Sequence, residues 1–438
     1  MFKRLKKQIL IFLFIFFSTI SYSQARQRIV IIRDTEIEDF LHEISRPIFL
    51  TASLNPDEIK FYIIQDSSIN AFVSGGQNIF VNTGTLTHFN EPDALLGIIA
   101  HETGHIAGGH LARIGEEMRT QQGVAVGAVL IGMIAALAGS AEAMQVSLLG
   151  GIHIGQQNIL QYTRTQEKSA DQLAINYLLK NNLSPESLLK SMEEFKREQM
   201  SIDDNMEYYI THPLSKNRVE HIKANLKDGI SSEWFNEKYD RRYNLIKAKI
   251  TGYTEPQNIV LRKYPKSDKT DYGLYARSVS YSLNGQKRGI NTMNFLIKRE
   301  ENPYFLETRA SVMFNFGKID KAIEDYQKAN LLLPNKPLIQ VALSLVIIKS
   351  GKADLYDEAI LNLEKTLEVE RDNLQAWKLL AEVYYKVEQK DLSHLSLAEY
   401  YSRVGDKEKT LNNLKLAKDN TKDIGVLLRI EDVRQSSR

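Results

Sequence analysis

The stretch that decides the fold is Leu95-Leu96-Gly97-Ile98-Ile99-Ala100-His101-Glu102-Thr103-Gly104-His105, in which an apolar run leads directly into an HExxH motif. The apolar approach predicts a buried helix, and on a helix His101 and His105 project from one face, one turn apart. Two imidazole nitrogens at this spacing can bind one metal ion, and Glu102 is placed to act on the water that the metal activates. The motif predicts a zinc site with one Zn²⁺ per chain.

The glycine in this motif predicts a close contact with another element. Two histidines and a glutamate on a buried helix are costly unless a metal satisfies them. Gly104 also costs about 1 kcal/mol of helix propensity relative to alanine. We therefore expect another part of the chain to approach this helix closely at Gly104.

A catalytic zinc site needs a third protein ligand. His110 lies one residue too early for the metzincin pattern HExxHxxGxxH, which would need histidine where Leu111 stands, so that class is excluded. We choose Glu167, in the segment Glu167-Lys168-Ser169-Ala170-Asp171 of a later helix. Asp171 follows four residues on, so one carboxylate can bind the metal while the other orients a ligand imidazole. Without the HExxH motif, this pair would be read as a solvent-exposed helix face.

The chain around these motifs alternates helical and extended patterns. Gly75-Gly76-Gln77 predicts a tight hairpin turn, because glycine tolerates positive φ. We expect helices at 35–46, 93–112, 160–180 and 185–199, and strands at 59–64, 71–74 and 78–82. These elements predict an α-rich α+β domain with a small sheet.

The second strand of the hairpin has a functional interpretation. If Asn78, Ile79, Phe80, Val81 and Asn82 form an edge strand, an extended unfolded segment can add to it by main-chain hydrogen bonds. An interior strand explains the same residues equally well.

Beyond about residue 265 the sequence predicts helix pairs. Gly285, Gly317 and Gly351 are 32 and 34 residues apart, which matches the length of a tetratricopeptide repeat. The clearest copy runs from 303 to 334, the next carries an insertion near 353–356, and the last two overlap. A plain helical bundle is the alternative, and the repeated spacing favours an all-α repeat array.

The N-terminus has the build of a secretory signal peptide. Basic residues at 3–7 precede the apolar run Ile9 to Phe17, and small residues near Ser23 offer a cleavage site. The alternative is an uncleaved anchor, for which the apolar run is short. The chain has no cysteine, so export is inferred from the leader alone.

The segment 123–139 carries no charge and is rich in Ala, Gly, Val and Ile. A single membrane crossing there would put His105 and Glu167 on opposite sides of a membrane, although both must hold one metal. We therefore interpret it as an apolar lid or as a loop that makes peripheral membrane contact. The net charge of +2 offers no case for nucleic acid as a partner.

Four segments together carry a resemblance to a known family. His101-Glu102-Thr103-Gly104-His105, the Glu167–Asp171 segment, Asn70-Ala71-Phe72 and Thr211-His212-Pro213-Leu214 resemble the M48 family of zinc metallopeptidases. The leader and the C-terminal repeats are similar to its periplasmic branch in Gram-negative bacteria. The resemblance covers nearly the whole mature chain.

The resemblance implies a zincin-like fold and a role for each motif residue. It implies His101, His105 and Glu167 as zinc ligands, Glu102 as general base and Asp171 as support for a ligand. It implies periplasmic location, unfolded or misassembled envelope proteins as substrates, and the outer-membrane β-barrel assembly machinery as a partner of the repeats.

Two residues downstream remain as hypotheses. His212 precedes a proline and is either a simple turn residue or a group near the zinc, where it stabilises the oxyanion or occupies the position of the water as a latency switch. Arg218 is a candidate to hold the charge that develops on the peptide carbonyl.

The sequence thus predicts a signal peptide at 1–25, a metallopeptidase domain at 26–250, a linker at 251–267, tetratricopeptide repeats at 268–420 and a tail at 421–438. The leading hypothesis is an endopeptidase that degrades misassembled or stalled outer-membrane proteins and assists their assembly. The competing hypothesis is a chaperone or scaffold whose repeats bind clients while the metal site is latent. An integral-membrane peptidase would require the leader or 123–139 to span a membrane.

Overall fold

The computed structural model describes residues 30–110, 164–201, 212 and 216–436. The predicted leader and the uncharged segment 123–139 lie outside these residues. Within the described ranges, no helix combines the length and apolar character needed to cross a membrane.

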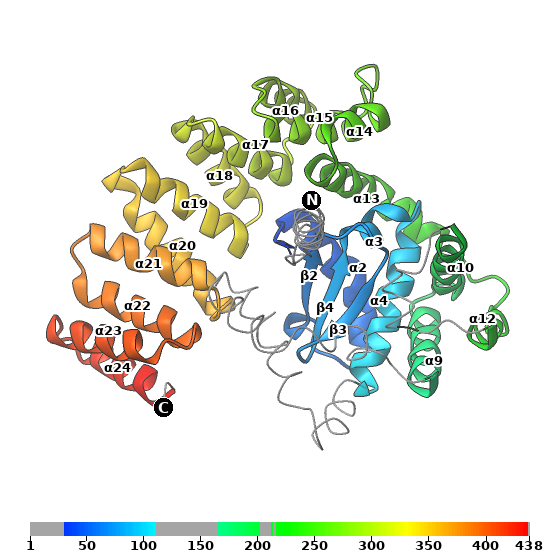
Figure 1. The fold of residues 1–438 in the computed structure, drawn as a ribbon, viewed down its shortest axis with the longest axis horizontal. Helices are drawn as coiled ribbons and strands as arrows, with labels where there is room; N and C mark the ends of the chain where they lie inside the picture. Colours follow the sequence, from blue (N-terminus) through cyan, green and yellow to red (C-terminus); the bar gives the residue numbers. More distant parts are fainter. Residues whose placement is uncertain (1–29, 111–163, 202–211, 213–215, 437–438) are drawn as a thin grey trace, which may run out of the picture. The chain divides into compact units, whose positions relative to one another are not determined.

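A small four-stranded sheet lies at the start of the fold (Figure 1). It contains β1 (Ile31–Ile32), β2 (Lys60–Ile64), β3 (Ala71–Ser74) and β4 (Asn78–Asn82), in the order β1-β2-β4-β3. The predicted hairpin is confirmed: β3 and β4 pair antiparallel, and the turn between them places Gly75 at φ 60° and Gly76 at φ 96°. β2 and β4 run parallel.

The prediction that Asn78, Ile79, Phe80, Val81 and Asn82 form an edge strand is wrong. β4 pairs with β2 over its full length, from Lys60 opposite Asn78 to Ile64 opposite Asn82, and with β3 on its other side. Its backbone groups are therefore already used on both sides. Among the described strands only β1 and β3 have a single neighbour, and β3 is the one that packs against the HExxH helix.

Alternation along the strands separates two faces of the sheet. Phe61, Ile63, Val73, Ile79 and Val81 join the main core. On the other face the rings of Tyr62, Phe80 and Phe72 stack across the strands, with centroids 5.1 and 5.0 Å apart. Successive side chains point to opposite faces of the sheet, and in these strands both faces carry apolar side chains.

Two helices supply much of the core beside the sheet. α2 (Thr35–Thr51) runs five residues beyond the predicted end and through Pro47, because Ile48 and Phe49 continue its buried stripe. α4 (Pro92–Ala107) carries the HExxH motif and ends earlier than the predicted Ala112. The short elements η1 (Pro56–Glu58) and α3 (Thr83–His88) connect the strands and helices.

Later helices pack on α4 and complete this part of the fold. α9 (Arg164–Lys180) and α10 (Glu186–Ser201) both contact α4, and α12 (Lys216–Lys223) contacts α9 and α10 (Figure 1). α13 (Glu233–Thr254) contacts α2, α3 and α4. α4 is therefore covered by helices as well as by the sheet.

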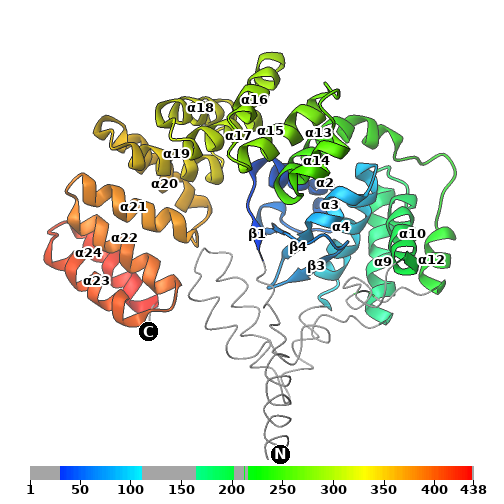
Figure 2. The ribbon, with the colours of Figure 1, turned by 45° about the horizontal axis from the view of Figure 1, so that its top comes forward.

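Paired helices make up the rest of the chain, and Figure 2 shows them following one another in sequence order. Each packs mainly against its neighbours in the chain. Gly285, Gly317, Gly351 and Gly405 all adopt positive φ just after a helix, so the spaced glycines mark turns. The elements are α14 (Gln257–Lys263), α15 (Asp271–Leu283), α16 (Arg288–Arg299), α17 (Pro303–Asn315), α18 (Ile319–Leu332), α19 (Pro337–Ser350), η2 (Ala353–Leu355), α20 (Tyr356–Val369), α21 (Leu374–Lys386), α22 (Lys390–Arg403), α23 (Lys407–Asp419) and α24 (Ile424–Ser436).

The two segments that the sequence analysis expected as a linker and a tail contain helices. The expected linker 251–267 contains the end of α13 and all of α14, and a Cβ at Gly252 would lie 2.7 Å from the Ala276 carbonyl oxygen of α15. The expected tail 421–438 contains α24, whose Ile430 and Val433 are buried in a small core. Both corrections arise because a few apolar positions are enough to pack a helix onto a neighbour.

α13 contributes to three hydrophobic clusters. Tyr243, Ile246 and Ile250 lie in the core of the sheet and α4, whereas Leu245 packs with α15, α16 and α17, and Ala248 packs with Val260 and Ala276. From Ile31 onward, the described residues accordingly form one compact unit.

A buried cluster of charges joins α2, α13 and α17. The Lys249 ammonium lies 2.7 Å from Asp34 Oδ2 and 3.2 Å from Glu36 Oε2, and Thr35 donates a 2.6 Å hydrogen bond to Glu307. Two carboxylates thus contact one ammonium, and Glu307 joins the cluster through Thr35. Glu307 retains partial exposure, yet its Oε2 is buried and accepts no hydrogen bond from the described residues. Burial, opposed by Lys249, raises the pKa of Glu307 to about 8.

We predict that this cluster makes stability depend on pH. Between about pH 4.5 and 8 the folded chain keeps a proton on Glu307 that the unfolded chain releases, so the free energy of unfolding falls as pH rises. The fall is at most about 1.4 kcal/mol per pH unit. Denaturant titrations from pH 5 to pH 8 should show that the free energy of unfolding falls less steeply with pH in Glu307→Gln than in wild type. In the control Glu301→Gln, at an exposed position, the free energy of unfolding should depend on pH as in wild type. The same pH dependence in Glu307→Gln would contradict the prediction.

Candidate metal centre

Four buried side chains from three parts of the chain converge on one point. His101 and His105 come from α4, Glu167 from the first turn of α9, and His212 from the segment before α12. One donor atom of each lies within 4.8 Å of the others, and all four side chains are at most 1% exposed. The structure therefore brings the predicted ligands together and adds His212 to them.

The distances within this group are short. His101 Nε2 lies 3.1 Å from His105 Nε2 and 3.3 Å from His212 Nδ1. Glu167 Oε1 lies 3.1 Å from His212 Nδ1 and 3.3 Å from His105 Nε2. The four donors thus face one another without an intervening side chain.

A close helix crossing makes this convergence possible. A Cβ at Gly104 would lie 2.7 Å from the Ala170 carbonyl oxygen and 3.0 Å from its Cα. α4 and α9 therefore approach to a distance that only glycine permits at position 104. The close approach predicted at Gly104 is confirmed.

Asp171 and Arg218 stand behind the ligands. Asp171 Oδ1 lies 3.0 Å from His101 Nδ1, on the side of the ring away from His105. The Arg218 guanidinium makes paired hydrogen bonds to Asp171 at 2.7 and 2.8 Å, and its Nη1 lies 2.6 Å from Glu167 Oε2. Arg218 also holds the pKa of the Asp171 carboxyl below its ordinary value, although burial acts in the opposite direction.

This placement corrects the hypothesis for Arg218. We expected its guanidinium to face charge developing on a peptide carbonyl, but it is 5% exposed and is bonded to two carboxylates of the site. A bidentate pair with a buried carboxylate is held strongly in place. The charge of Arg218 is therefore used to hold Glu167 and Asp171.

Glu102 lies beside the donor group. It is fully buried, its Oε1 is 3.4 Å from His212 Nε2, and neither carboxylate oxygen accepts a hydrogen bond from the described residues. Burial raises the pKa of Glu102 above its ordinary value. A buried carboxylate without donors is costly unless a ligand or substrate completes its surroundings.

The electrostatics of the site call for a dication. With all three carboxylates ionised, Glu102, Glu167 and Asp171 face one guanidinium, so a charge of two is left uncompensated. Burial lowers the pKa of His101, but hydrogen bonds to Asp171 and Glu167 outweigh it and raise that pKa to about 10.

The donor set fits zinc. Ligand atoms about 2.0–2.1 Å from a tetrahedral ion lie about 3.3–3.4 Å from one another, close to the 3.1–3.4 Å separations between neighbouring donors of this group. Imidazole nitrogens and a carboxylate oxygen are ligands that zinc accepts readily. With His212 included, the group offers four donor atoms, all within 4.8 Å of one another.

His110 is a residue whose role the sequence analysis missed. It is 2% exposed, and its Nδ1 lies 3.1 Å from Nδ1 of His105. The metzincin spacing excluded it as a third ligand, and it does not belong to the donor group of the described residues. The glycine pair Gly108-Gly109 before it was the available signal, since it allows the chain to turn back at the end of α4.

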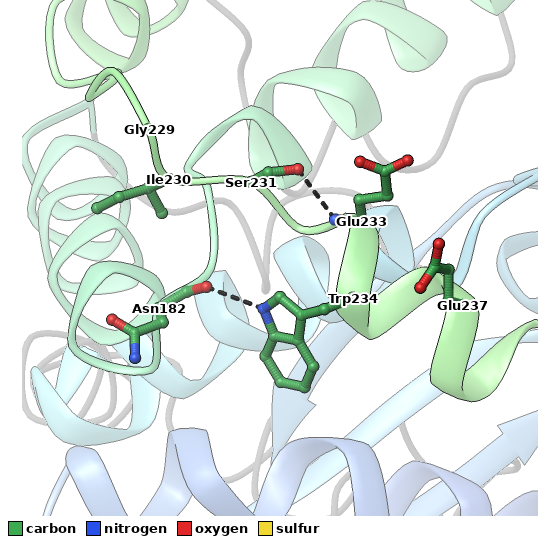
Figure 3. Close-up of a pocket in the computed structure, with 7 residues that line it drawn as sticks. All are labelled: Asn182, Gly229, Ile230, Ser231, Glu233, Trp234 and Glu237. Atoms are coloured by element: carbon green, nitrogen blue, oxygen red, sulfur yellow. Dashed lines mark hydrogen bonds between the residues drawn. The ribbon is translucent and has the colours of Figure 1, made fainter.

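A separate surface pocket lies between α13 and the end of α9 (Figure 3). The indole of Trp234 donates a 3.1 Å hydrogen bond to the Asn182 carbonyl, and Glu233 and Glu237 lie beside it. These side chains are exposed and none belongs to the donor group. The pocket is not the reactive site.

An HExxH helix, a glutamate from a second helix and a buried carboxylate beside them define a zinc metallopeptidase. Residues 32–226 match the model of peptidase family M48. This match covers the domain that carries the donor group, and it makes the chain a metalloendopeptidase whose substrates are proteins.

Relatives extend the similarity beyond the peptidase domain. The chain is 22% identical to the Beta-barrel assembly-enhancing protease of Escherichia coli (strain K12), over 94% of this chain and 86% of that protein. It is 27% identical to the Putative beta-barrel assembly-enhancing protease of Vibrio cholerae, over 43% of this chain and 39% of that one. Metalloprotease YcaL of Escherichia coli (strain K12) is 26% identical over 40% of this chain and 66% of its own length.

We predict that Gly104→Ala damages the site although alanine favours helix. The methyl group must displace the Ala170 backbone, so α4 and α9 separate, and such overpacking typically costs about 1–3 kcal/mol, more than the roughly 1 kcal/mol of propensity gained. Calorimetry should show a lower Tm, and metal analysis should show less zinc per chain. Gly425→Ala in α24 is the matched control, because its nearest neighbour is the flexible Asp423 side chain. A Tm for Gly104→Ala at or above wild type would contradict the steric argument.

Proposed function

We propose that this chain is an envelope zinc endopeptidase in which His101, His105 and Glu167 hold the metal and Glu102 is the general base. The observation that carries the proposal is the convergence of His101, His105, Glu167 and His212 into one buried donor group. When bound, zinc supplies a Lewis acid that lowers the pKa of water and polarises a carbonyl.

Glu102 has the properties required of the base. Its carboxylate is buried next to the donor group, and its raised pKa brings proton uptake closer to neutral pH. It accepts a proton from the attacking water and passes it to the nitrogen of the cleaved peptide bond. Asp171 orients the His101 ring, and Arg218 fixes Asp171 and Glu167.

Replacing the base tests the catalytic assignment. Glu102→Gln keeps the shape of the side chain but cannot accept a proton, so kcat/KM for casein or a labelled peptide should fall by about 10²–10⁴-fold while zinc content is unchanged. The matched control is Glu91→Gln at the start of α4, where an exposed carboxylate pairs with Lys190.

The same variant separates the enzyme from a scaffold. If Glu102→Gln retains zinc and fully replaces wild type in cells that lack this chain, then the repeats carry the function and the metal site is latent. If it retains zinc but fails to replace wild type, proteolysis is the function. Unchanged casein cleavage by the variant would remove Glu102 as the base.

We further propose that His212 keeps the site latent. Its Nδ1 lies 3.3 Å from His101 Nε2 and 3.1 Å from Glu167 Oε1, in the fourth position of the donor group rather than beside it. A catalytic zinc site leaves that position open for water and substrate. Of the two roles considered for His212, occupation of the water position has the better geometric support.

His212→Ala tests this assignment by opening the fourth position. Even a competing ligand worth about 1.4 kcal/mol would slow cleavage about tenfold, so peptide cleavage by the variant should rise about tenfold or more. His221→Ala is the matched control, since His221 bonds Gln172 outside the donor group. A fall in activity would favour oxyanion stabilisation instead, and unchanged activity would exclude both roles.

The cellular role is proposed from the similarity over most of the chain. The relative of similar length is named a β-barrel assembly-enhancing protease, and 94% of this chain aligns with it. We propose that residues 1–25 export the chain to the periplasm, and that it degrades unfolded, misassembled or stalled outer-membrane proteins and assists their assembly. The helix pairs of 268–420, as tetratricopeptide repeats, would contact the outer-membrane β-barrel assembly machinery, and 123–139 would supply the lid or peripheral membrane contact.

A further inference from the structure

The end of α4 is built to turn one side chain back onto the metal centre. The Gly108 amide donates to the Gly104 carbonyl at 2.9 Å, and the Gly109 amide donates to the Ile106 carbonyl at 3.0 Å. Gly109 then adopts φ 62°, a left-handed conformation that ends the helix and reverses the chain. His110 follows immediately and folds back against the last turn of α4.

The His110 ring is seated against His105. The two Nδ1 atoms are 3.1 Å apart, and the rings meet edge to face with centroids 5.0 Å apart at 80°. Gly108 leaves room for this ring, because a Cβ there would lie 2.5 Å from His110 Nε2. Both glycines thus serve the position of His110, one through its backbone angle and the other through its missing side chain.

The position of His105 decides which of its nitrogens would carry the proton in the zinc site. His105 Nε2 faces His101 Nε2 and Glu167 Oε1, so Nε2 is the atom that can bind a metal. A neutral imidazole that binds through Nε2 carries its proton on Nδ1. A hydrogen bond between two Nδ1 atoms needs one donor and one acceptor, so Nδ1 of His110 must accept.

His110 is not itself a ligand in this arrangement. Its contact lies on the Nδ1 side of His105, whereas the other donors meet on the Nε2 side. The group of donor atoms within 4.8 Å of one another contains His212 but not His110.

We propose that His110 is a positioning residue of the zinc site: it accepts a hydrogen bond from His105 Nδ1–H and thereby sets the tautomer and the ring angle of His105. This inference rests on the proposed zinc site. His101 is oriented by the Asp171 carboxylate and His105 by a neutral imidazole, so the two histidine ligands are supported unequally. Outer partners of ligand imidazoles typically contribute 10–100-fold to metal affinity.

Three variants of the full-length protein test the hydrogen bond rather than the packing. His110→Asn keeps an amide oxygen about where Nδ1 lies, His110→Gln moves the amide one bond outward, and His110→Leu removes the acceptor. Zinc affinity is measured by chelator competition, and the absorption spectrum of the cobalt(II)-substituted protein reports ligand geometry. We expect His110→Leu and His110→Gln to bind zinc 10–100-fold more weakly and to alter the spectrum, and His110→Asn to stay within a few-fold of wild type.

The outcomes separate the inference from the function on which it rests. If wild type binds zinc and all three variants bind it equally well, the role of His110 is wrong and the zinc site stands. Equal losses in His110→Asn and His110→Gln would mean that His110 acts through packing, which also overturns the proposal. If His110→Leu fails to fold, the comparison of Asn with Gln decides. If wild type binds no zinc, the proposed function is wrong, and so is the role of His110 that rests on it.

Discussion

The contact on which the rest of the structure depends is the crossing of α4 and α9 at Gly104 and Ala170. The HExxH spacing alone brings two imidazoles onto one helix face, but it supplies only half of the donor group. The backbone of α9 must come within van der Waals contact of α4 for Glu167 and Asp171 to reach the same histidines. A single missing methyl group permits that approach. On another side of α4, Gly97 has a similar role, because a Cβ there would lie 2.7 Å from the Ser187 backbone of α10.

Charge is arranged in layers around the site. Next to the donors stands Asp171, and behind Asp171 stands Arg218, which also reaches Glu167. Burying these groups is expensive, and removing one partner from such a network leaves the others uncompensated. The network therefore restrains each ligand in one orientation, at the cost of desolvating its charged groups. Such restraint is required because a small displacement of the catalytic groups slows the reaction strongly.

The sequence predicted the parts of the site that depend on local spacing. His101, His105 and Glu167 follow from helical periodicity and from the ligand count of zinc, and the structure groups them. The sequence predicted that β4 pairs with β3 but not that it also pairs with β2, because pairing with β2 is a long-range choice that alternation along one strand does not encode. Arg218 was misassigned for a similar reason: a charged residue near a site in sequence can face either the substrate or the ligands. His110 was excluded as a ligand by its spacing, but its contact with His105 depends on the φ of Gly109, which the sequence does not specify.

The position of α13 limits how the peptidase domain and the helical repeats can be separated or exchanged. Its opposite sides complete different cores, with Tyr243 and Ile250 on one and Leu245 and Ala248 on the other. A fragment that ends after Ile250 would leave the second set facing water, whereas a fragment that begins there would lack the surface on which α15 lies. The repeats are therefore not a detachable appendage. A chimera that grafts them onto another peptidase would have to carry α13 along, together with the neighbours on both of its sides.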